Sequence, residues 1–481
     1  MTFHRLGVLM GGYTLVGLGF VSAGLISQVY LPSPSVLPPA ASVASPIPDL
    51  SVTPEPEETP KQPIDSVANL DVVLDLLHQE YLDEVNDRAL FASSYRLMKE
   101  FLATQKVNVK DFPVLPPKVE DRAGLTQAWK DMLSKVEPKV AGKFDHQRLS
   151  YIALKCMLAA LKDPYCVVLE PREFRVFEEH MSGGNFSGIG VMIELDREHK
   201  NRVTVSQPIP DGPADKTGIQ TGDVLAKIDG QPTDGWDIEK AANKIRGPQG
   251  SLVALTIYRP KEKRSFEVSV KRDIIHVRSV TSKIVAPHVG YLQINVFGEE
   301  TVGEFEEEIA RVQGKGATSY IVDLRNNGGG YINGAIEICS HFVPSGKTVV
   351  SVVNKRLHRS EEHESLGREQ FEGPMVVLVN RFSASASEIT AGCLQDHHRA
   401  KLVGETTFGK ASVQQVEHLA DGGAFKYTVA HYLTPSGKDI HRKGIKPDVE
   451  VKVPIEARIG SDKEDKVLQV GIKTLQAELK K

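Results

Sequence analysis

Residues 379–388 place a serine hydroxyl, that of Ser385, beside backbone N–H groups that can stabilise a negative charge. An apolar run ends at Val379, small residues turn the chain, and a helix is predicted to begin at Ser385. A serine at the end of a buried strand lies where ligands bind in α/β folds, and the N–H groups of a helix start can hold an oxyanion. Ser385 and Glu388 also match a capping box, which is the commoner use of such a serine. This segment alone favours a helix cap, with a nucleophile as the alternative.

A lysine among small and apolar residues is the second candidate. Lys410 lies within residues 404–414, next to glycine and alanine. Burial would lower the pKa of its amine and allow it to act as a general base. If residues 410–414 are extended, Gln414 points to the same side and its amide can orient the amine. The alternative is a solvated loop lysine, which is the usual situation of a lone lysine.

Three consecutive glycines at 328–330 follow the predicted strand at 319–324. Glycines let a backbone approach a substrate closely and adopt positive φ, so this loop can supply a second oxyanion donor. The alternative is an ordinary flexible turn before the helix predicted at 333–341.

A glycine-containing loop also precedes a predicted edge strand at 189–195. Such a loop can bind the carboxylate at the end of a peptide, which then adds to the sheet as a strand. The loop residues are Phe186, Gly188, Ile189 and Gly190, and the helix residues Ile238, Ala242 and Ile245 are expected to line the side-chain pocket.

Taken together and in this order, the segments resemble the carboxy-terminal processing peptidase (tail-specific protease) family. The matching motifs are DPYC at Asp163, FSGIGV at Phe186, GPADKTGIQTGDVLAKIDG at Gly212, IRGPQGS at Ile245, DLRNNGGG at Asp323, SASASEI at Ser383, TFGKASVQ at Thr407 and YLTPSGKDIHRKGI at Tyr432. The resemblance covers roughly residues 66–455, and residues 184–272 resemble a PDZ domain.

The resemblance implies a role for several residues. Ser385 would be the nucleophile, Lys410 the base and Gln414 the partner of the base. The N–H groups of Ala386 and of either Gly328 or Gly329 would hold the oxyanion, although Gly328 stands where many members carry proline. Arg246, at the end of the predicted PDZ helix, resembles an arginine that senses the bound tail. The alternative is that Arg246 has a purely structural role, as a cation that stabilises the C-terminus of the helix.

We therefore expect a serine endopeptidase with a Ser–Lys dyad, whose PDZ domain captures protein substrates by a free C-terminus. It would need no metal and no other cofactor. Two alternatives stay open. One is a catalytically silent PDZ adaptor, and the other is a Ser-His-Asp hydrolase that uses a histidine such as His397 or His398.

The N-terminal residues predict an export or anchoring segment. Arg5 is the only basic residue before Lys61, and residues 6–30 carry no charge, which is long enough to span a membrane. Residues 31–64 hold ten of the 28 prolines and predict an extended linker. We expect residues 1–30 to be a membrane anchor or signal segment and the rest of the chain to lie outside the cytoplasm, in a periplasm or an equivalent lumen.

The remaining pattern predicts an α+β multidomain fold. Residues 65–183 are helical and are expected to form a cap or a homo-oligomer surface. Residues 184–272 form a small β-barrel with one helix, inserted before an α/β protease core at 273–460, and residues 461–481 form a final amphipathic helix.

Composition sets outer limits on the function. A chain of 481 residues suggests about three domains, and 58 basic against 62 acidic residues give a net charge of −4. Near-neutral charge argues against nucleic acid as the main partner. The four cysteines form no C-x-x-C pair, so a structural zinc site is not expected, and their disulfide state is left open.

Overall fold

The computed structural model describes residues 13–16, 66–181, 185–196, 202–209, 212–368, 371–452 and 464–479. They divide into two compact units. One unit contains the helical region up to Met181 together with everything from Ser279 onwards, and the other contains residues 182–278. The predicted anchor and the proline-rich linker lie outside the described residues, apart from the short strand β1 (Tyr13–Val16). No helix within the described ranges has the length and hydrophobicity needed to cross a membrane.

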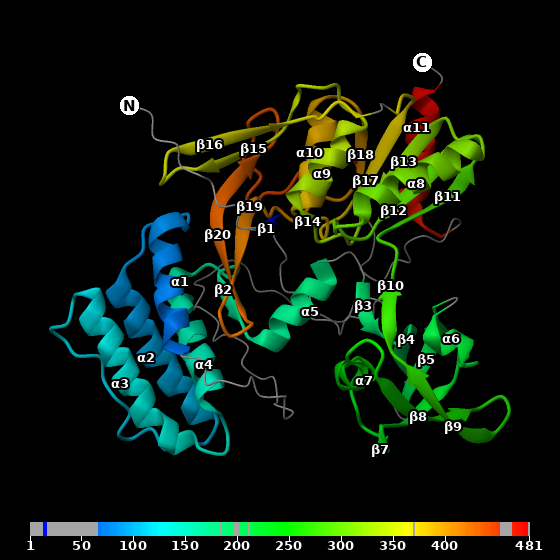
Figure 1. Cartoon of the computed structure of the whole chain (residues 1–481). Coiled ribbons are helices and arrows are strands. Elements are labelled where there is room, and N and C mark those ends of the chain that lie inside the picture. Colours follow the sequence, from blue (N-terminus) through cyan, green and yellow to red (C-terminus); the bar gives the residue numbers. More distant parts are fainter. Residues whose placement is uncertain are drawn as a thin grey trace, which may run out of the picture. The chain divides into compact units, whose positions relative to one another are not determined.

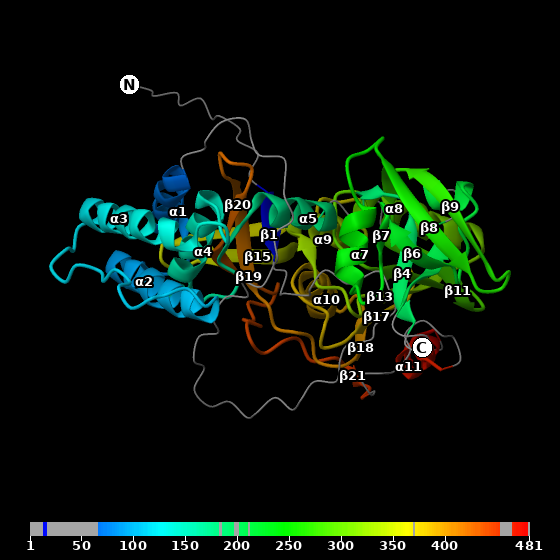
Figure 2. The same ribbon diagram turned by 90° about the horizontal axis from the view of Figure 1, so that it is seen from below.

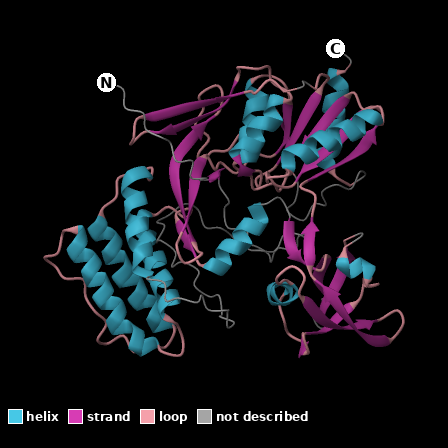
Figure 3. Cartoon of the chain, in the orientation of Figure 1, coloured by secondary structure: helices cyan, strands magenta, loops and turns pink. Residues whose placement is uncertain are grey.

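Four long helices open the first unit, and Figure 3 shows them as a cyan bundle. They are α1 (Ser66–Glu80), α2 (Asp87–Thr104), α3 (Arg122–Val140) and α4 (His146–Leu158), followed by the short helix η1 (Ala159–Leu161), strand β2 (Val167–Leu169) and helix α5 (Pro171–Met181). The side chains of Asn86, Asp121 and Asp145 cap α2, α3 and α4 by accepting a backbone N–H. Helix α3 lies within the region predicted to be helical, although Gly124 and Pro138 weaken its local helical signal.

The bundle shares its apolar core with an antiparallel sheet. Phe425 and Tyr427 of β20 (Ala424–Leu433) pack in one cluster with Leu74, Phe91 and Trp129 of the helices. The Leu82 N–H also donates to the Thr428 carbonyl at 2.9 Å. The helical region is therefore an integral part of the first unit.

The first sheet of this unit has the order β11-β12-β13-β17-β18-β21, and Figure 2 shows the last four of these strands side by side. The strands are β11 (Val280–Ala286), β12 (Val289–Ile294), β13 (Ser319–Asp323), β17 (Met375–Val379), β18 (Lys401–Gly404) and β21 (Val449–Glu450). Val322 and Val377 pack with the helices α8 (Thr301–Gly314), α9 (Ile332–Ser340) and α10 (Ala386–Asp396). Ile321 and Val376 pack on the opposite face with α11 (Lys466–Glu478).

The second sheet has the order β14-β1-β19-β20-β15-β16, and β2 also pairs with β20. Its remaining strands are β14 (Gly330–Tyr331), β19 (Ser412–His418), β15 (Thr348–Asn354) and β16 (Arg359–Glu364). The apolar run at 348–353 predicts a strand of the α/β core sheet, and this prediction is wrong: β15 pairs antiparallel with β16 and β20. An apolar run predicts a strand but does not specify which sheet it joins.

The second unit is built on the sheet β4-β5-β6-β8-β9, with β7 (Gln231–Pro232) beside β6. Its strands are β4 (Val191–Asp196), β5 (Arg202–Pro208), β6 (Val224–Ile228), β8 (Leu252–Arg259) and β9 (Arg264–Lys271), and its helices are α6 (Pro213–Lys216) and α7 (Ile238–Ile245). Asp229 and Gly230 both have positive φ, as the predicted Asp-Gly hairpin turn requires. A separate pair, β3 (Asn185–Gly188) and β10 (Asp273–His276), was not predicted. All four cysteines of the chain are buried free thiols.

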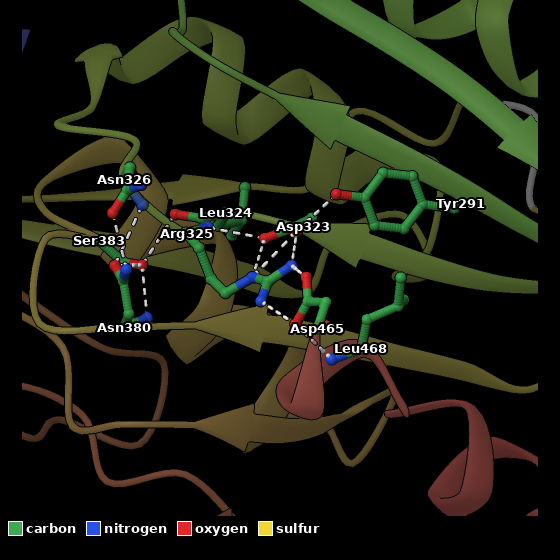
Figure 4. A network of polar contacts seen from close by, with 9 residues as sticks. All are labelled: Tyr291, Asp323, Leu324, Arg325, Asn326, Asn380, Ser383, Asp465 and Leu468. Carbon is green, nitrogen blue, oxygen red and sulfur yellow. Dashed lines mark hydrogen bonds and ion pairs between the residues drawn. The ribbon is translucent and has the colours of Figure 1, made fainter. Parts of the chain in front are cut away.

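Helix α11 lies against the first sheet (Figure 1). A buried ionic network, drawn in Figure 4, fastens it there. Arg325 donates to both oxygens of Asp323 and, at 2.8 and 2.7 Å, to both oxygens of Asp465. Asp465 also caps α11 by accepting from the Leu468 N–H, and Tyr291 donates to Asp323 at 2.6 Å. The three charged side chains are almost fully buried, so each depends on the others to balance its charge.

We expect Arg325→Met to destabilise the first unit by about 3–5 kcal/mol, because two buried carboxylates lose their cation. Urea unfolding followed by tryptophan fluorescence measures this. Glu478→Gln, which removes the partly exposed pair with Lys401, is the control and should cost about 0–1 kcal/mol. Equal destabilisation by the two variants would contradict the role assigned to the network.

Candidate active site

Ser385 lies at the junction between β17 and α10, where the sequence predicts it. It is fully buried and has φ of 63°, a conformation that costs a non-glycine residue about 1–3 kcal/mol. The turn before it is held by side chains: Ser383 donates to the Leu324 carbonyl at 2.8 Å, and Asn380 exchanges hydrogen bonds with Asn326 (Figure 4). Such strain persists only where the surroundings enforce it, which favours a functional serine over a simple cap.

Lys410 lies in the loop between β18 and β19 and is fully buried. The alternative of a solvated loop lysine is therefore wrong. Burial, and then the positive charge of Lys426, lower the pKa of Lys410 to about 5, against the opposing effect of the Asp163 and Glu388 carboxylates. At neutral pH the amine is unprotonated, which is the form that a general base needs.

The Lys410 amine makes no hydrogen bond with any described residue. Its Nζ lies 3.7 Å from the centre of the Tyr165 ring. The hydrogen bond to the Ser385 hydroxyl that a Ser–Lys dyad would use is therefore not formed in this structure. A dyad requires the flexible lysine side chain to turn towards Ser385.

Gln414 lies in β19, in the extended segment that the sequence predicts. Its amide Nε2 donates to the hydroxyls of Ser412 at 2.9 Å and Thr428 at 3.4 Å, and it makes no hydrogen bond to the Lys410 amine. Thr428 in turn donates to Asp163 at 2.6 Å, and the same carboxylate accepts the Tyr165 N–H. The DPYC segment is thus linked to Gln414 through Asp163 and Thr428, and it contacts Lys410 through the Tyr165 ring.

The glycine loop lies directly against Ser385. A Cβ on Gly329, whose φ is 104°, would come within 2.6 Å of the Ser385 Cβ. The Gly329 N–H already donates to the Asn327 side chain at 2.8 Å, and the Asn327 carbonyl accepts the Ala384 N–H. Of the two predicted glycines, Gly328 is therefore the better candidate for an oxyanion donor, and the other candidate, Ala386, is the first residue of α10.

The predicted tail-binding residues lie within the second unit. The carbonyls of Ile189 and Gly190 accept hydrogen bonds from Ala214 and Ile209, which shape the loop before β4. β4 is an edge strand, as predicted, but Phe186 and Gly188 belong to strand β3 and not to the loop. Ile245 is buried in the core, Ile238 and Ala242 are partly buried against it, and Arg246 follows the last residue of α7.

The two histidines weighed as a base lie at the wrong end of α10. His397 and His398 follow its last residue, whereas Ser385 precedes its first. Eleven helical residues separate them from Ser385 by about 16 Å. His397 is also close to the Thr348 carbonyl, at 2.8 Å. Neither can be the base for Ser385.

Three functional neighbours of Lys410 were missed by sequence reasoning. Lys426, on β20, is buried, and burial lowers its own pKa to about 8. Asp163 and Tyr165 belong to the DPYC motif, but the sequence analysis gave neither residue a role. The DPYC motif could have indicated that Asp163 and Tyr165 lie near the site, but no local sequence pattern distinguishes Lys426 from other lysines.

Comparison with known proteins supports the resemblance. The model of peptidase family S41 matches residues 288–451, and that of the PDZ domain matches residues 204–259. A probable CtpA-like serine protease of Staphylococcus haemolyticus (strain JCSC1435) is 36% identical over 333 residues, which cover 68% of this chain and 65% of that protein. The carboxy-terminal processing protease CtpA of Bacillus subtilis (strain 168) is 35% identical over 333 residues, 68% of this chain and 69% of that one. The solved photosystem II D1 C-terminal processing protease is 28% identical, with 77% of this chain and 94% of that chain covered and a TM-score of 0.42.

The electrostatics around Lys410 predict a specific pH dependence. Peptide hydrolysis should rise with pH through about pH 5, as the Lys410 amine loses its proton. Below about pH 8 Lys426 is protonated and opposes a second positive charge on Lys410. Lys426→Gln should therefore raise the pKa of Lys410 and move the acid limb of kcat/KM to higher pH.

The measurement is the pH profile of kcat/KM for one peptide. Lys401→Gln, which removes a more exposed lysine on β18, should leave the acid limb in place. A limb that does not move in Lys426→Gln, or that moves to lower pH, would contradict this description of the site.

Proposed function

The chain belongs to peptidase family S41, and from this premise we propose that it is a serine endopeptidase that cleaves proteins near their C-terminus, with Ser385 as the nucleophile and Lys410 as the general base. The observation that carries the proposal is a fully buried lysine and a fully buried serine at positive φ, whose backbone N–H groups both donate to Glu388. Burial lowers the pKa of this lysine to about 5. A silent adaptor would not require either feature.

The proposed reaction begins when the Lys410 side chain turns to the Ser385 hydroxyl and accepts its proton. The Ser385 Oγ attacks the scissile carbonyl, and the N–H groups of Ala386 and Gly328 stabilise the oxyanion. The protonated lysine then gives its proton to the leaving amine. Water, activated by the same amine, hydrolyses the acyl-enzyme. Gln414 would orient the lysine amine in the productive position.

The PDZ domain would select the substrate. We propose that an unstructured C-terminus adds to the edge strand β4 beside α7, with its carboxylate at the loop of Ile189 and Gly190. Arg246 would sense the bound tail. We also propose that residues 1–30 anchor or export the protein, so that the rest of the chain lies outside the cytoplasm. The N-terminal helices would form a homo-oligomer surface.

The dyad is tested by substitution. Ser385→Ala and Lys410→Ala should each lower kcat by about a thousand-fold or more while the protein stays folded. Ser383→Ala and Ser387→Ala, whose hydroxyls donate to the carbonyls of Leu324 and Asn327, should keep kcat within about ten-fold. Full activity in Ser385→Ala would refute the proposal, and a dead Ser383→Ala with an active Ser385→Ala would identify the other serine as the nucleophile.

Tail capture is tested with two peptides of the same sequence, one ending in a carboxylate and one in an amide. The amide should raise KM by about ten-fold or more, because the loop loses its charged partner. The isolated C-terminal product should inhibit cleavage only in its carboxylate form. Equal KM values for the two peptides would show that the carboxylate is not recognised.

A further inference from the structure

The peptide groups of Ser385 and Lys410 are bound by the same two side chains. The Glu388 carboxylate is fully buried, in the first turn of α10. Its Oε2 accepts the Ser385 N–H at 3.0 Å and the Lys410 N–H at 2.8 Å. Its Oε1 accepts the Gly409 N–H at 2.7 Å and the Thr407 hydroxyl at 2.5 Å.

Tyr432 contacts the carbonyl side of the same two residues. Its hydroxyl lies 3.2 Å from the Ser385 carbonyl and 3.1 Å from the Lys410 carbonyl. Tyr432 is fully buried on β20, and its own N–H donates to the Ala411 carbonyl at 2.9 Å. The N–H of each proposed catalytic residue thus points to Glu388, and its carbonyl points to Tyr432.

These contacts connect two residues that are attached to different sheets. Ser385 follows a strand of the first sheet, whereas Lys410 precedes a strand of the second sheet. No ladder of the described strands joins β17 to β19. Besides these two side chains, the described backbone offers the hydrogen bond from the Phe408 N–H to the Ser383 carbonyl, at 3.0 Å.

Resting on the proposed dyad, we propose that Glu388 and Tyr432 are positioning residues that clamp the Ser385 and Lys410 backbones to one another. Neither needs to touch the substrate. The clamp also supports the strained φ of Ser385, since the Glu388 carboxylate accepts the N–H group of that residue. The Ser385 carbonyl accepts the Ile389 N–H at 2.9 Å and lies within reach of the Tyr432 hydroxyl as well. With both backbones fixed, the movement left to the dyad is rotation of the lysine side chain towards the serine hydroxyl.

The test uses substitutions that keep volume and remove only the hydrogen bonds. Glu388→Gln replaces one accepting oxygen by an NH₂ group, which meets N–H donors. Tyr432→Phe removes the hydroxyl and keeps the ring. Glu304→Gln is the matched control for the first, because Glu304 is a buried carboxylate that accepts the N–H groups of Ser279 and Val280 away from the dyad. Tyr320→Phe is the control for the second, since Tyr320 is buried and its hydroxyl accepts a hydrogen bond from Gln313 on α8, away from the dyad.

The four variants are compared for kcat and KM at a temperature at which thermal denaturation shows each to be folded. We expect Glu388→Gln to lower kcat about 100-fold or more, as a small misplacement of reacting groups does, with KM almost unchanged. Tyr432→Phe should lower kcat about 3- to 10-fold. The two controls should keep kcat within about two-fold even if they lower the melting temperature.

A serine-reactive fluorophosphonate supplies a second readout. Its reaction with Ser385 should slow in Glu388→Gln in proportion to kcat, and it should stay at the wild-type rate in Glu304→Gln. If Glu388→Gln is folded and keeps its kcat, or if Glu304→Gln loses as much, the clamp is refuted. That result is distinct from failure of the proposed function, which would show as activity in Ser385→Ala.

Discussion

The Glu388 carboxylate is the contact on which the candidate active site depends. It accepts four hydrogen bonds in the interior, and two of the donors are the peptide groups of Ser385 and Lys410. Burial raises the pKa of Glu388, while the surrounding donors oppose this shift. A charge in this position is tolerated because it lies at the start of α10, where the helix dipole and several N–H groups favour an anion.

The helical region contributes to the chemistry through packing. It shares a core with β20, and this brings Asp163 and Tyr165 to the wall of the lysine pocket. Water is thereby excluded from an amine that would otherwise be protonated at neutral pH. The region expected to be a cap or an oligomer surface therefore helps to set the protonation state of the proposed base.

Helices and strands were largely predictable because their signal is local. The apolar spacing of α10 and α11 and the uniformly apolar run of β17 correspond closely to the structure. The signal was weak for α3, which contains glycine and proline, and it gave the wrong sheet for β15. Sheet partners are set by contacts between segments far apart in the chain, which one stretch of sequence does not encode.

For the site, the motifs and their order along the chain were enough to predict Ser385, Lys410 and Gln414 as the candidate catalytic residues. The tertiary structure decided which alternatives survive: it buries Lys410 and places His397 and His398 at the far end of α10. It also confirms the predicted capping box of Ser385 and Glu388, and it adds a hydrogen bond from the Lys410 N–H that makes Glu388 a link between two sheets. The physical reason is that a pKa depends on desolvation and on neighbouring charges such as Lys426 and Asp163, and only folding brings those charges to the lysine.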